Sequence, residues 1–378
     1  MTSRAPTNAE AQRGMDHGND PFLALARALT ILSEQDGLRS FSLPYPREAQ
    51  LALDRVILHC LNHGWTPPKS LPELLSWCTR RSVGDAEFGV SPALVSQGAR
   101  WIHPIGMMPT RTCLELAPLG RPGRVEQDAL NSLSALEHRC GSAGRFSRCR
   151  QFLARHPLVT HQDRFGRRWE AMTWNKVREL YEPVPEALLD RRMLTVCGTC
   201  GLPARAPSGE RESGPDTWCE GEDCPPGVRF RLLREPGQCL ILRRSLRAFL
   251  VAPARTEQAA MDELARIGGG HQLLADSGLG AYRITGSGLR TCLMQVYDRR
   301  QPSFLGGRVS EAFSSATDPA LVVVPRRAVD QDGYRDAFET ALSNECRGRV
   351  TLTTPDDLER HLRVQDPPPT QKVEGADA

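Results

Sequence analysis

The chain has 378 residues, of which 40% are hydrophobic and 25% charged, and its formal net charge is +3. This composition is ordinary for a globular protein of two or three domains, and the small net charge favours no particular partner. No apolar run approaches the roughly 20 residues of a membrane-spanning helix, and residues 1–20 lack the apolar segment of a secretory signal. We therefore expect a cytoplasmic protein without membrane spans.

Both ends of the chain, residues 1–20 and 364–378, are polar and are expected to be disordered. Between them, residues 21–192 are predicted to form a mainly helical domain. The segment 82–124 is rich in glycine and proline, and its sequence predicts no clear helix or strand. Apolar residues at helical spacing predict helices at 21–35, 46–64, 70–81 (with Ser70 as N-cap), 126–140, 146–155 and 169–181.

A basic segment covers residues 139–192, where twelve basic side chains stand against six acidic ones and aromatic residues are interleaved. This pattern is typical of a nucleic-acid surface, although a solvated helix face above core aromatics has the same text. The candidate contacts for nucleic acid are Arg145, Arg148, Arg150, Arg167 and Arg168.

Four of the twelve cysteines form a cluster in residues 193–235. Cys197 and Cys200 make one close pair, and Cys219 and Cys224 make a second pair after a polar spacer. Two such pairs are typical of a zinc ribbon, in which four thiolates surround a structural Zn²⁺ ion. Because this segment holds few apolar residues, the metal would serve as its core.

In residues 240–363 the sequence pattern changes and predicts alternating helices and strands. The order α-β-β-β-α-β, followed by α-β-α, is that of a restriction-endonuclease-like core, the PD-(D/E)xK fold. The whole chain is thus expected to be multidomain, α and then α/β. The predicted elements are a helix at 256–267, strands at 271–275, 281–286 and 290–297, a helix at 307–315, a strand at 320–325, a helix at 332–345, a strand at 349–353 and a helix at 354–362.

Nucleases of this fold use metal-assisted chemistry. Two carboxylates on neighbouring strands bind Mg²⁺, and a lysine two residues after the second one positions or activates water. Here Gly280 and Ala281 stand where the first aspartate is expected, Gln295 replaces the second carboxylate and Tyr297 replaces the lysine. No lysine occurs between residues 177 and 371, so none in this domain can take over the role. The site is predicted to be degenerate, and whether the chain is an enzyme is left open.

Three acids remain as alternative ligands for magnesium, namely Glu263, Asp276 and Asp298. Magnesium would be a cofactor only if these relocated ligands made the nuclease site active. As scattered acids they also fit an ordinary solvated surface.

Several stretches resemble a bacterial family. The segment FSLPYPREAQLALDRVILHCLNHGWTPPKSLPELLSWC, together with PTRTCLEL (109–116) and RQFLARHPLVT (150–160), resembles domain Y of proteins encoded in pPIWI-RE three-gene islands. The cysteine cluster and the α/β region resemble the restriction-endonuclease-like protein of the same islands. In relatives the strand at 293–302 is expected to contain D-V-K-D, and here Gln295 and Tyr297 interrupt that pattern while Asp298 and Pro302 keep it.

The resemblance implies a defence system against invading DNA or RNA–DNA hybrids, whose other proteins are a PIWI-module protein and a DinG-type helicase. Our first interpretation is a nuclease-fold subunit with a degenerate site that binds nucleic acid or docks a partner. A second is an active Mg²⁺-dependent DNA endonuclease with relocated ligands. A third is a transcription or assembly factor that uses a zinc ribbon for interaction.

Overall fold

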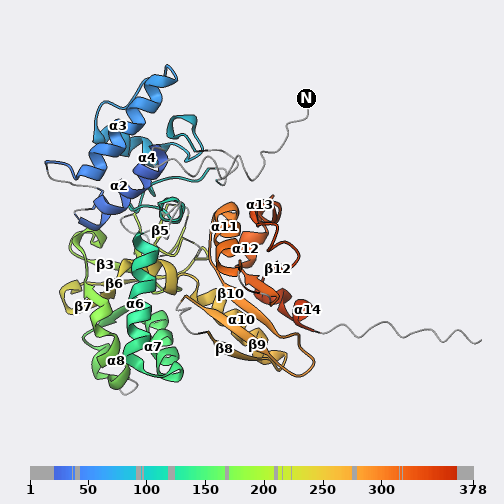
Figure 1. The fold of residues 1–378 in the computed structure, drawn as a ribbon. Helices are drawn as coiled ribbons and strands as arrows, with labels where there is room; N and C mark the ends of the chain where they lie inside the picture. Colours follow the sequence, from blue (N-terminus) through green and yellow to red (C-terminus); the bar gives the residue numbers. More distant parts are fainter. Residues whose placement is uncertain are drawn as a thin grey trace, which may run out of the picture.

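A computed structural model describes residues 21–363, apart from 36, 39–42, 91–94, 96–97, 118–123, 167–169, 208–211, 215, 223, 275–278, 315 and 317. The two ends predicted to be disordered therefore lie outside the described residues. Figure 1 shows two parts of the molecule side by side. Residues 21–251, from blue to yellow, are called the helical half below, and residues 254–363, in orange and red, form an α/β domain. Within the described residues, no helix has both the length and the apolar character needed to cross a bilayer.

The first core is built by helices from residues 21–117. A continuous cluster of buried side chains joins these helices, including Leu25, Leu29, Val56 and Trp101. The hydroxyl of Ser70 accepts a hydrogen bond from the main chain of Glu73, which confirms the predicted N-cap. The helices are α2 (Pro21–Gln35), α3 (Arg47–Asn62), α4 (Leu71–Arg80) and α5 (Arg111–Leu116).

A second core combines helices with a short sheet. It contains α6 (Arg124–Cys140), α7 (Ala143–Arg155) and α8 (Ala171–Val177), and the central strand of its sheet is β7 (Cys239–Leu242). Strands β1 (Leu158–Thr160) and β2 (Tyr181–Pro183) flank β7 in antiparallel pairing. The helix predicted at 169–181 therefore ends early, because Tyr181 pairs with Leu242 in this sheet.

The chain after β7 stays with the helical half. Strand β7 leads into α9 (Arg244–Leu246) and the π-helical turn η7 (Arg247–Val251), whose side chains pack into the second core. The first helix of the α/β domain begins only at Ala254. The start expected for that domain, residue 240, thus falls within the central strand of another sheet.

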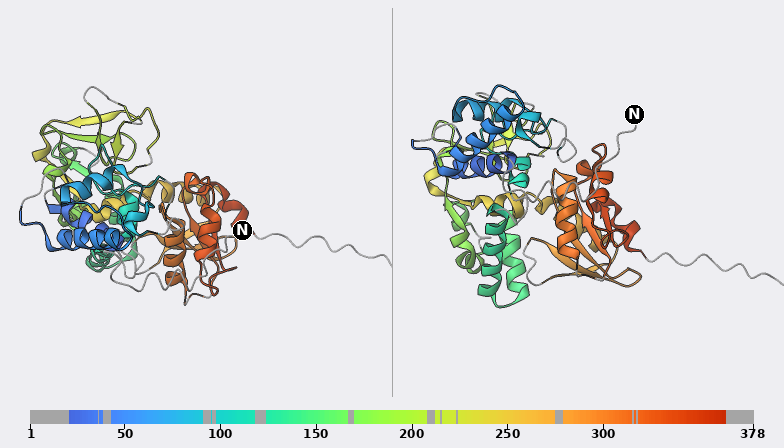
Figure 2. Two further views of the ribbon diagram at one scale, coloured as in Figure 1. Left: turned by 90° about the horizontal axis from the view of Figure 1, so that it is seen from above. Right: turned by 45° about the horizontal axis from the view of Figure 1, so that its top comes forward.

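The cysteine segment forms a small separate sheet between β2 and β7. Its strands are β3 (Leu194–Cys197), β4 (Pro203–Arg205), β5 (Trp218–Cys219) and β6 (Phe230–Leu233), in the spatial order β5-β4-β3-β6 and all antiparallel. Figure 2 shows this sheet, in yellow-green, on the helical half and away from the orange and red domain.

The α/β domain has the predicted order of elements. Helix α10 (Ala254–Arg266) precedes strands β8 (Gly270–Leu273), β9 (Ala281–Thr285) and β10 (Cys292–Val296), which form an antiparallel meander. Helix α11 (Pro302–Phe313) then leads to β11 (Ala320–Val323). Finally, α12 (Arg326–Val329) and α13 (Tyr334–Ala341) precede β12 (Val350–Thr353) and α14 (Leu358–Leu362). Helix α11 starts five residues before the predicted position because Pro302 occupies its first turn.

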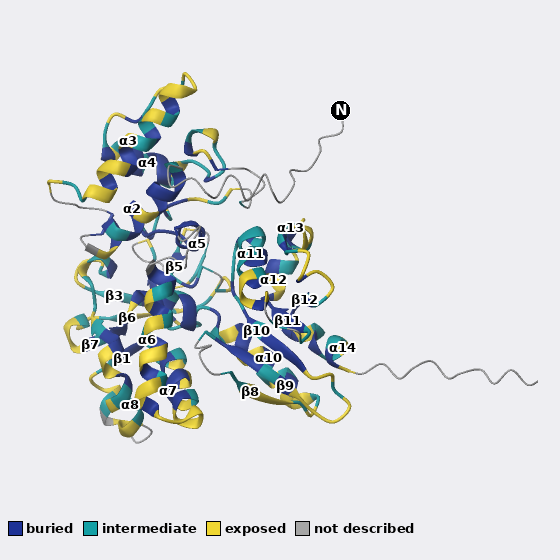
Figure 3. Ribbon diagram, in the orientation of Figure 1, coloured by how far each residue is buried: buried dark blue, intermediate teal, exposed yellow. Residues whose placement is uncertain are grey.

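Strands β10, β11 and β12 are parallel and lie on one side of the five-stranded sheet, whose order is β12-β11-β10-β9-β8. One face of the sheet packs on α10 and α14, and the other packs on α11 and α13. All four residues of β11 are buried, as the continuous apolar run predicts (Figure 3). This arrangement turns the carboxyl end of β10 toward the helical half.

Candidate metal centre and the end of strand β10

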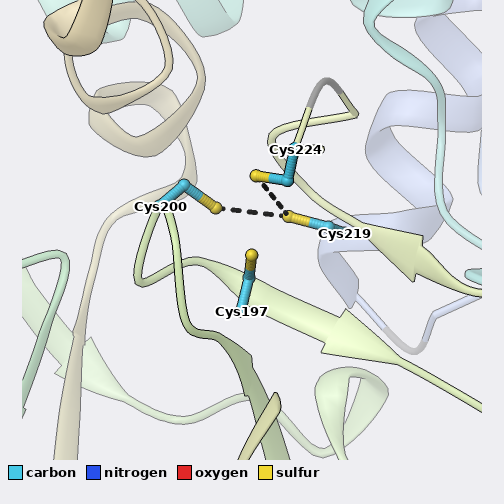
Figure 4. Close-up of side chains that lie close together, drawn as sticks. All are labelled: Cys197, Cys200, Cys219 and Cys224. Atoms are coloured by element: carbon cyan, nitrogen blue, oxygen red, sulfur yellow. Dashed lines mark hydrogen bonds between the residues drawn. The ribbon is translucent and has the colours of Figure 1, made fainter. Parts of the chain in front are cut away.

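Four cysteine sulfurs converge between two turns of the small sheet (Figure 4). Cys197 ends β3, Cys219 ends β5, and Cys200 and Cys224 follow in the adjoining turns. All four Sγ atoms lie within 4.8 Å of one another. The Sγ of Cys219 is 3.2 Å from that of Cys200 and 3.8 Å from that of Cys224. Thiolates bound at about 2.3 Å to one tetrahedral zinc ion would be about 3.8 Å apart, so the donor set fits such an ion.

Glycine residues allow the two turns to close on the sulfurs. A side chain at Gly198 would collide with the main-chain carbonyl oxygen of Arg229, the residue directly before β6. A Cβ at Gly221 would lie 3.3 Å from Sγ of Cys200, and the N–H of Gly221 donates to Sγ of Cys219 at 3.3 Å. The main chain thus supplies a hydrogen bond to one sulfur, as is usual around metal-bound thiolates.

Each thiol of the cluster also changes the pKa values of its neighbours. Hydrogen bonding from Cys200, and then from Cys219 and Cys224, lowers the pKa of the Cys197 thiol. Hydrogen bonding to Cys197, and then to the other two, raises the pKa of Cys219. Metal binding requires these thiols as thiolates, so the cluster must release protons when an ion binds.

The loop that carries the second cysteine pair contacts both halves of the molecule. Glu220 accepts two hydrogen bonds, of 2.7 and 3.1 Å, from Arg247 in η7. The carboxylate of Glu222 accepts the main-chain N–H of Arg111 at 2.9 Å, and its carbonyl oxygen accepts a bond from Arg300 at 3.3 Å. Glu222 therefore links α5 of the helical half to Arg300 of the α/β domain.

Strands β9 and β10 bring together the positions where nuclease carboxylates are expected, but the side chains there are different. Ala281 lies directly opposite Gln295 in the antiparallel register. Two residues after Gln295, Tyr297 stands in the place of the lysine, and burial raises the tyrosine pKa to about 12. A methyl, an amide and a neutral phenol thus replace two carboxylates and an ammonium group, so the strand pair offers no charged ligand for Mg²⁺.

The residues after β10, 298–301, are called the β10 exit below. Asp298, which we considered as a metal ligand, is 8% exposed and lies between two arginines. Its carboxylate is 2.9 Å from Nη1 of Arg111 in α5 and 3.0 Å from Nη2 of Arg327 in α12. Burial acts to raise the Asp298 pKa, but Arg111 and Arg327 outweigh it and hold the pKa below its usual range. The carboxylate is held in two ion pairs, of which the pair with Arg111 joins the two halves.

The other residues of the β10 exit are also bound by the helical half. The carboxylate of Glu115 in α5 accepts the main-chain N–H groups of Arg300, at 2.9 and 3.1 Å, and of Gln301, at 3.0 Å. The Gln301 amide donates to the hydroxyl of Thr112 at 3.0 Å. Burial, the largest influence, raises the pKa of Glu115.

A further acid of the helical half, Glu126 in α6, pairs with two arginines of the α/β domain. It is 4% exposed and accepts hydrogen bonds from Arg299 at 2.7 Å and from Arg308 at 3.2 Å. Burial acts to raise the Glu126 pKa, yet these two guanidinium groups lower it overall. Charges also surround Tyr297, since Arg299, Arg308 and Glu126 all influence its phenol.

A second contact between the halves lies at the start of β9. Arg150 in α7 is 4% exposed and forms a two-pronged ion pair with Glu257 in α10, with one nitrogen–oxygen distance of 2.6 Å. The hydroxyl of Tyr282 bonds to both side chains. A Cβ at Gly280 would lie 2.9 Å from Nη2 of Arg150, so this ion pair packs directly against the position expected for the first aspartate.

Of the remaining candidate ligands, the structure describes Glu263 alone. Glu263 lies toward the end of α10 and pairs with Arg266, with nitrogen–oxygen distances of 2.5 and 2.8 Å. Asp276 lies outside the described residues. Among the residues that the structure describes, the cysteine cluster is the group of three or more potential ligands close enough to hold a metal ion.

The candidate arginines for nucleic acid divide into two groups. Arg145 and Arg148 are exposed on α7. Arg150 is buried and ion-paired, so its position does not fit the predicted role at a nucleic-acid surface. Arg167 and Arg168 lie outside the described residues.

Sequence reasoning missed the acids and arginines that join the two halves, including Arg111, Glu115, Glu126 and Glu257. One signal was present for Glu115, which stands between two leucines in CLEL, where a solvated acid is unexpected. For Glu257 no such signal exists, because the surrounding text TEQAAMDEL is that of an ordinary exposed helix.

Comparison with known families agrees with part of the expected resemblance. Residues 22–160 match the family model described as pPIWI_RE three-gene island domain Y, which supports the island family. No curated protein and no solved structure matches the chain. The matched region includes Arg111, Glu115, Glu126 and Arg150, so the side chains that hold the α/β domain belong to the domain Y region.

Proposed function

We propose that this chain is a component of a pPIWI-RE-type defence system, in which a nuclease-derived domain has lost its chemistry and serves to bind nucleic acid or dock a partner. The domain Y match supports the defence context. The order of helices and strands in residues 254–362 supports a restriction-endonuclease-like origin for the α/β domain.

The observation that carries the proposal is the register that sets Ala281 opposite Gln295, with Tyr297 two residues further along the chain. Metal-assisted phosphodiester cleavage requires anionic oxygen ligands that hold Mg²⁺ next to the scissile phosphate. The strand pair has none, and the nearby Glu257 is already neutralised by Arg150. The β10 exit is also packed against α5 and α6 instead of being open to a duplex.

The cysteine cluster is proposed to hold a structural zinc ion. Four thiolates fill all four positions of a tetrahedral site, which leaves none for a catalytic water molecule. Zinc binding would fix the loop of Glu220 and Glu222, and through it the contacts of that loop with Arg247, Arg111 and Arg300. Its role would therefore be to stabilise the junction of the two halves.

For nucleic acid, the exposed arginines Arg145 and Arg148 are the proposed contacts. They lie three residues apart on α7 and so share one face of the helix. The PIWI-module protein and the DinG-type helicase of the islands remain the proposed protein partners.

The proposal is tested by incubating the full chain with plasmid and single-stranded DNA in Mg²⁺ or Mn²⁺ and scoring cleavage and gel shift together. We expect a gel shift without cleavage, and a weaker, less salt-dependent shift in an Arg145→Glu, Arg148→Glu variant. Arg255→Glu, Arg290→Glu, at two exposed arginines of the α/β domain, is the control with the same change of charge. Metal-dependent cleavage by the wild type that is lost in Glu263→Ala would support relocated ligands and contradict the proposal.

A further inference from the structure

A cavity of about 610 Å³ lies in the helical half, where α2, α6, β2 and α9 meet. Its lining includes Ser33, Ser132, Glu182, Arg243 and Arg244. Cavities of about 300–1,000 Å³ are the size range in which proteins bind small molecules. Nothing in the proposed function uses this cavity.

Arg244 is the unusual residue of the lining. It is 9% exposed, and its Nη1 donates to the hydroxyl of Ser33, while its Nε has no hydrogen-bond partner. Among the described residues, no carboxylate forms an ion pair with its guanidinium group, since the nearby Glu220 is held by Arg247. Burial, the largest influence, lowers the pKa of Arg244. The charges of Glu220 and Glu34 act in the opposite direction but do not offset burial, so the buried cation is destabilising where it stands.

Other buried arginines of the chain have partners that offset this cost. Arg111 pairs with Asp298, and Arg150 pairs with Glu257. Arg205 donates to two main-chain carbonyl groups. Arg244 differs from them in that it has neither an ion pair nor a main-chain carbonyl partner among the described residues and lines a cavity, which is the arrangement of a binding site and not of a structural ion pair.

The chemistry of the lining restricts the ligand. A guanidinium group presents parallel N–H donors that match a phosphate group, and the exposed Arg243 adds a second positive charge at the same wall. Three acids, Glu34, Asp128 and Glu182, also line the cavity, and they would repel a polyphosphate chain while accepting hydrogen bonds from sugar hydroxyl or base amino groups. We propose that this cavity binds a phosphomonoester of mononucleotide size, with its phosphate on Arg244.

The test is calorimetric titration of the full chain with inorganic phosphate, AMP, and a short oligonucleotide with either a 5′-phosphate or a 5′-hydroxyl end. We expect AMP to bind and inorganic phosphate to compete with it. Loss of one charge-assisted contact in Arg244→Gln should weaken AMP binding about tenfold or more. A preference for the 5′-phosphate oligonucleotide would assign the phosphate to a strand end, and its absence would assign it to a free nucleotide.

A second pair of variants keeps the test independent of folding around the buried arginine. Ser132→Glu places a carboxylate in the cavity from the surface of α6 and should also weaken AMP binding about tenfold. Ser134→Glu, exposed on the same helix and outside the lining, should bind AMP as the wild type does. The inference is overturned if AMP and phosphate do not bind, or if Arg244→Gln and Ser132→Glu both bind AMP with unchanged affinity.

Discussion

Metal ligands are expected at two places in this chain, the cysteine cluster and the end of strand β10. The expected ligands are present at the first place and are replaced at the second. At the cysteine cluster, all four expected ligands are present and their sulfurs lie within 4.8 Å of one another. Along β10, the expected carboxylate and lysine are replaced by Gln295 and Tyr297, and the acid that remains, Asp298, binds arginines.

The difference lies in where the partners come from. The cysteine ligands are neighbours in the sequence, and each pair sits on a single turn. The partners of the β10 exit come from far away, since Arg111 is 187 residues from Asp298 and Glu115 is 185 residues from Arg300. A metal site whose ligands are close in the sequence can be predicted from the sequence. The role of a charged residue at a strand end depends on distant residues that pack against it, and these cannot be read from the local sequence.

Loss of a cysteine ligand is expected to have the largest effect. Zinc binding by small four-ligand sites is worth about 10–16 kcal/mol, so Cys197→Ser should abolish zinc retention and lower the melting temperature. Metal analysis and thermal unfolding measure both effects. Cys239→Ser, at a buried cysteine outside the cluster, should retain the metal. Full zinc content in Cys197→Ser would show that the cluster is not the metal centre.

The next largest effect is expected at the β10 exit. Asp298→Ala leaves Arg111 buried without its carboxylate and should lower the free energy of unfolding by about 3–5 kcal/mol. Urea denaturation measures this loss, and Asp330→Ala, at an exposed acid nearby in the sequence, is the control. Equal stability of the two variants would mean that the ion pairs do not hold the halves together.

Arg150 and Arg148 lie on the same helix, α7, but Arg150 is buried in an ion pair and Arg148 is exposed. Arg150→Met leaves Glu257 buried without its cation and should cost about 3 kcal/mol of unfolding free energy. Arg148→Met removes an exposed charge and should change stability by less than about 0.5 kcal/mol. Urea unfolding of both variants is the measurement, and a comparable loss in Arg148→Met would refute the assignment of the buried contact to Arg150.

A smaller effect is expected from pH. The pKa values of Asp298 and Glu126 are lowered in the folded chain, so their stabilisation is present above the unfolded-state values of about 4 and is lost as pH falls through the folded-state values. Burial raises the pKa of Glu115, which has the opposite sign. Urea midpoints should therefore fall below about pH 4, and fall less in Asp298→Asn. An identical pH profile in that variant would exclude Asp298 as a source of the effect.

The sequence predicts the regular elements better than their contacts. The elements of residues 254–362 follow from apolar periodicity, because each helix or strand buries a face of its own. Strands β1 and β2 were missed, since each has three residues and is defined by pairing with β7, from a distant part of the chain. Arg150 was placed on a basic surface because charge density in a sequence carries no information on which arginine is buried.

The most direct test of this account is the metal inventory of the full chain after titration with Mn²⁺, followed by electron paramagnetic resonance. We predict a retained zinc ion at the cysteine cluster and no specific Mn²⁺ site in the α/β domain. An Ala281→Asp, Gln295→Asp, Tyr297→Lys variant serves as the comparison that restores the missing ligands. A specific Mn²⁺ site in the wild type that disappears in Gln295→Ala or Asp298→Ala would contradict the account.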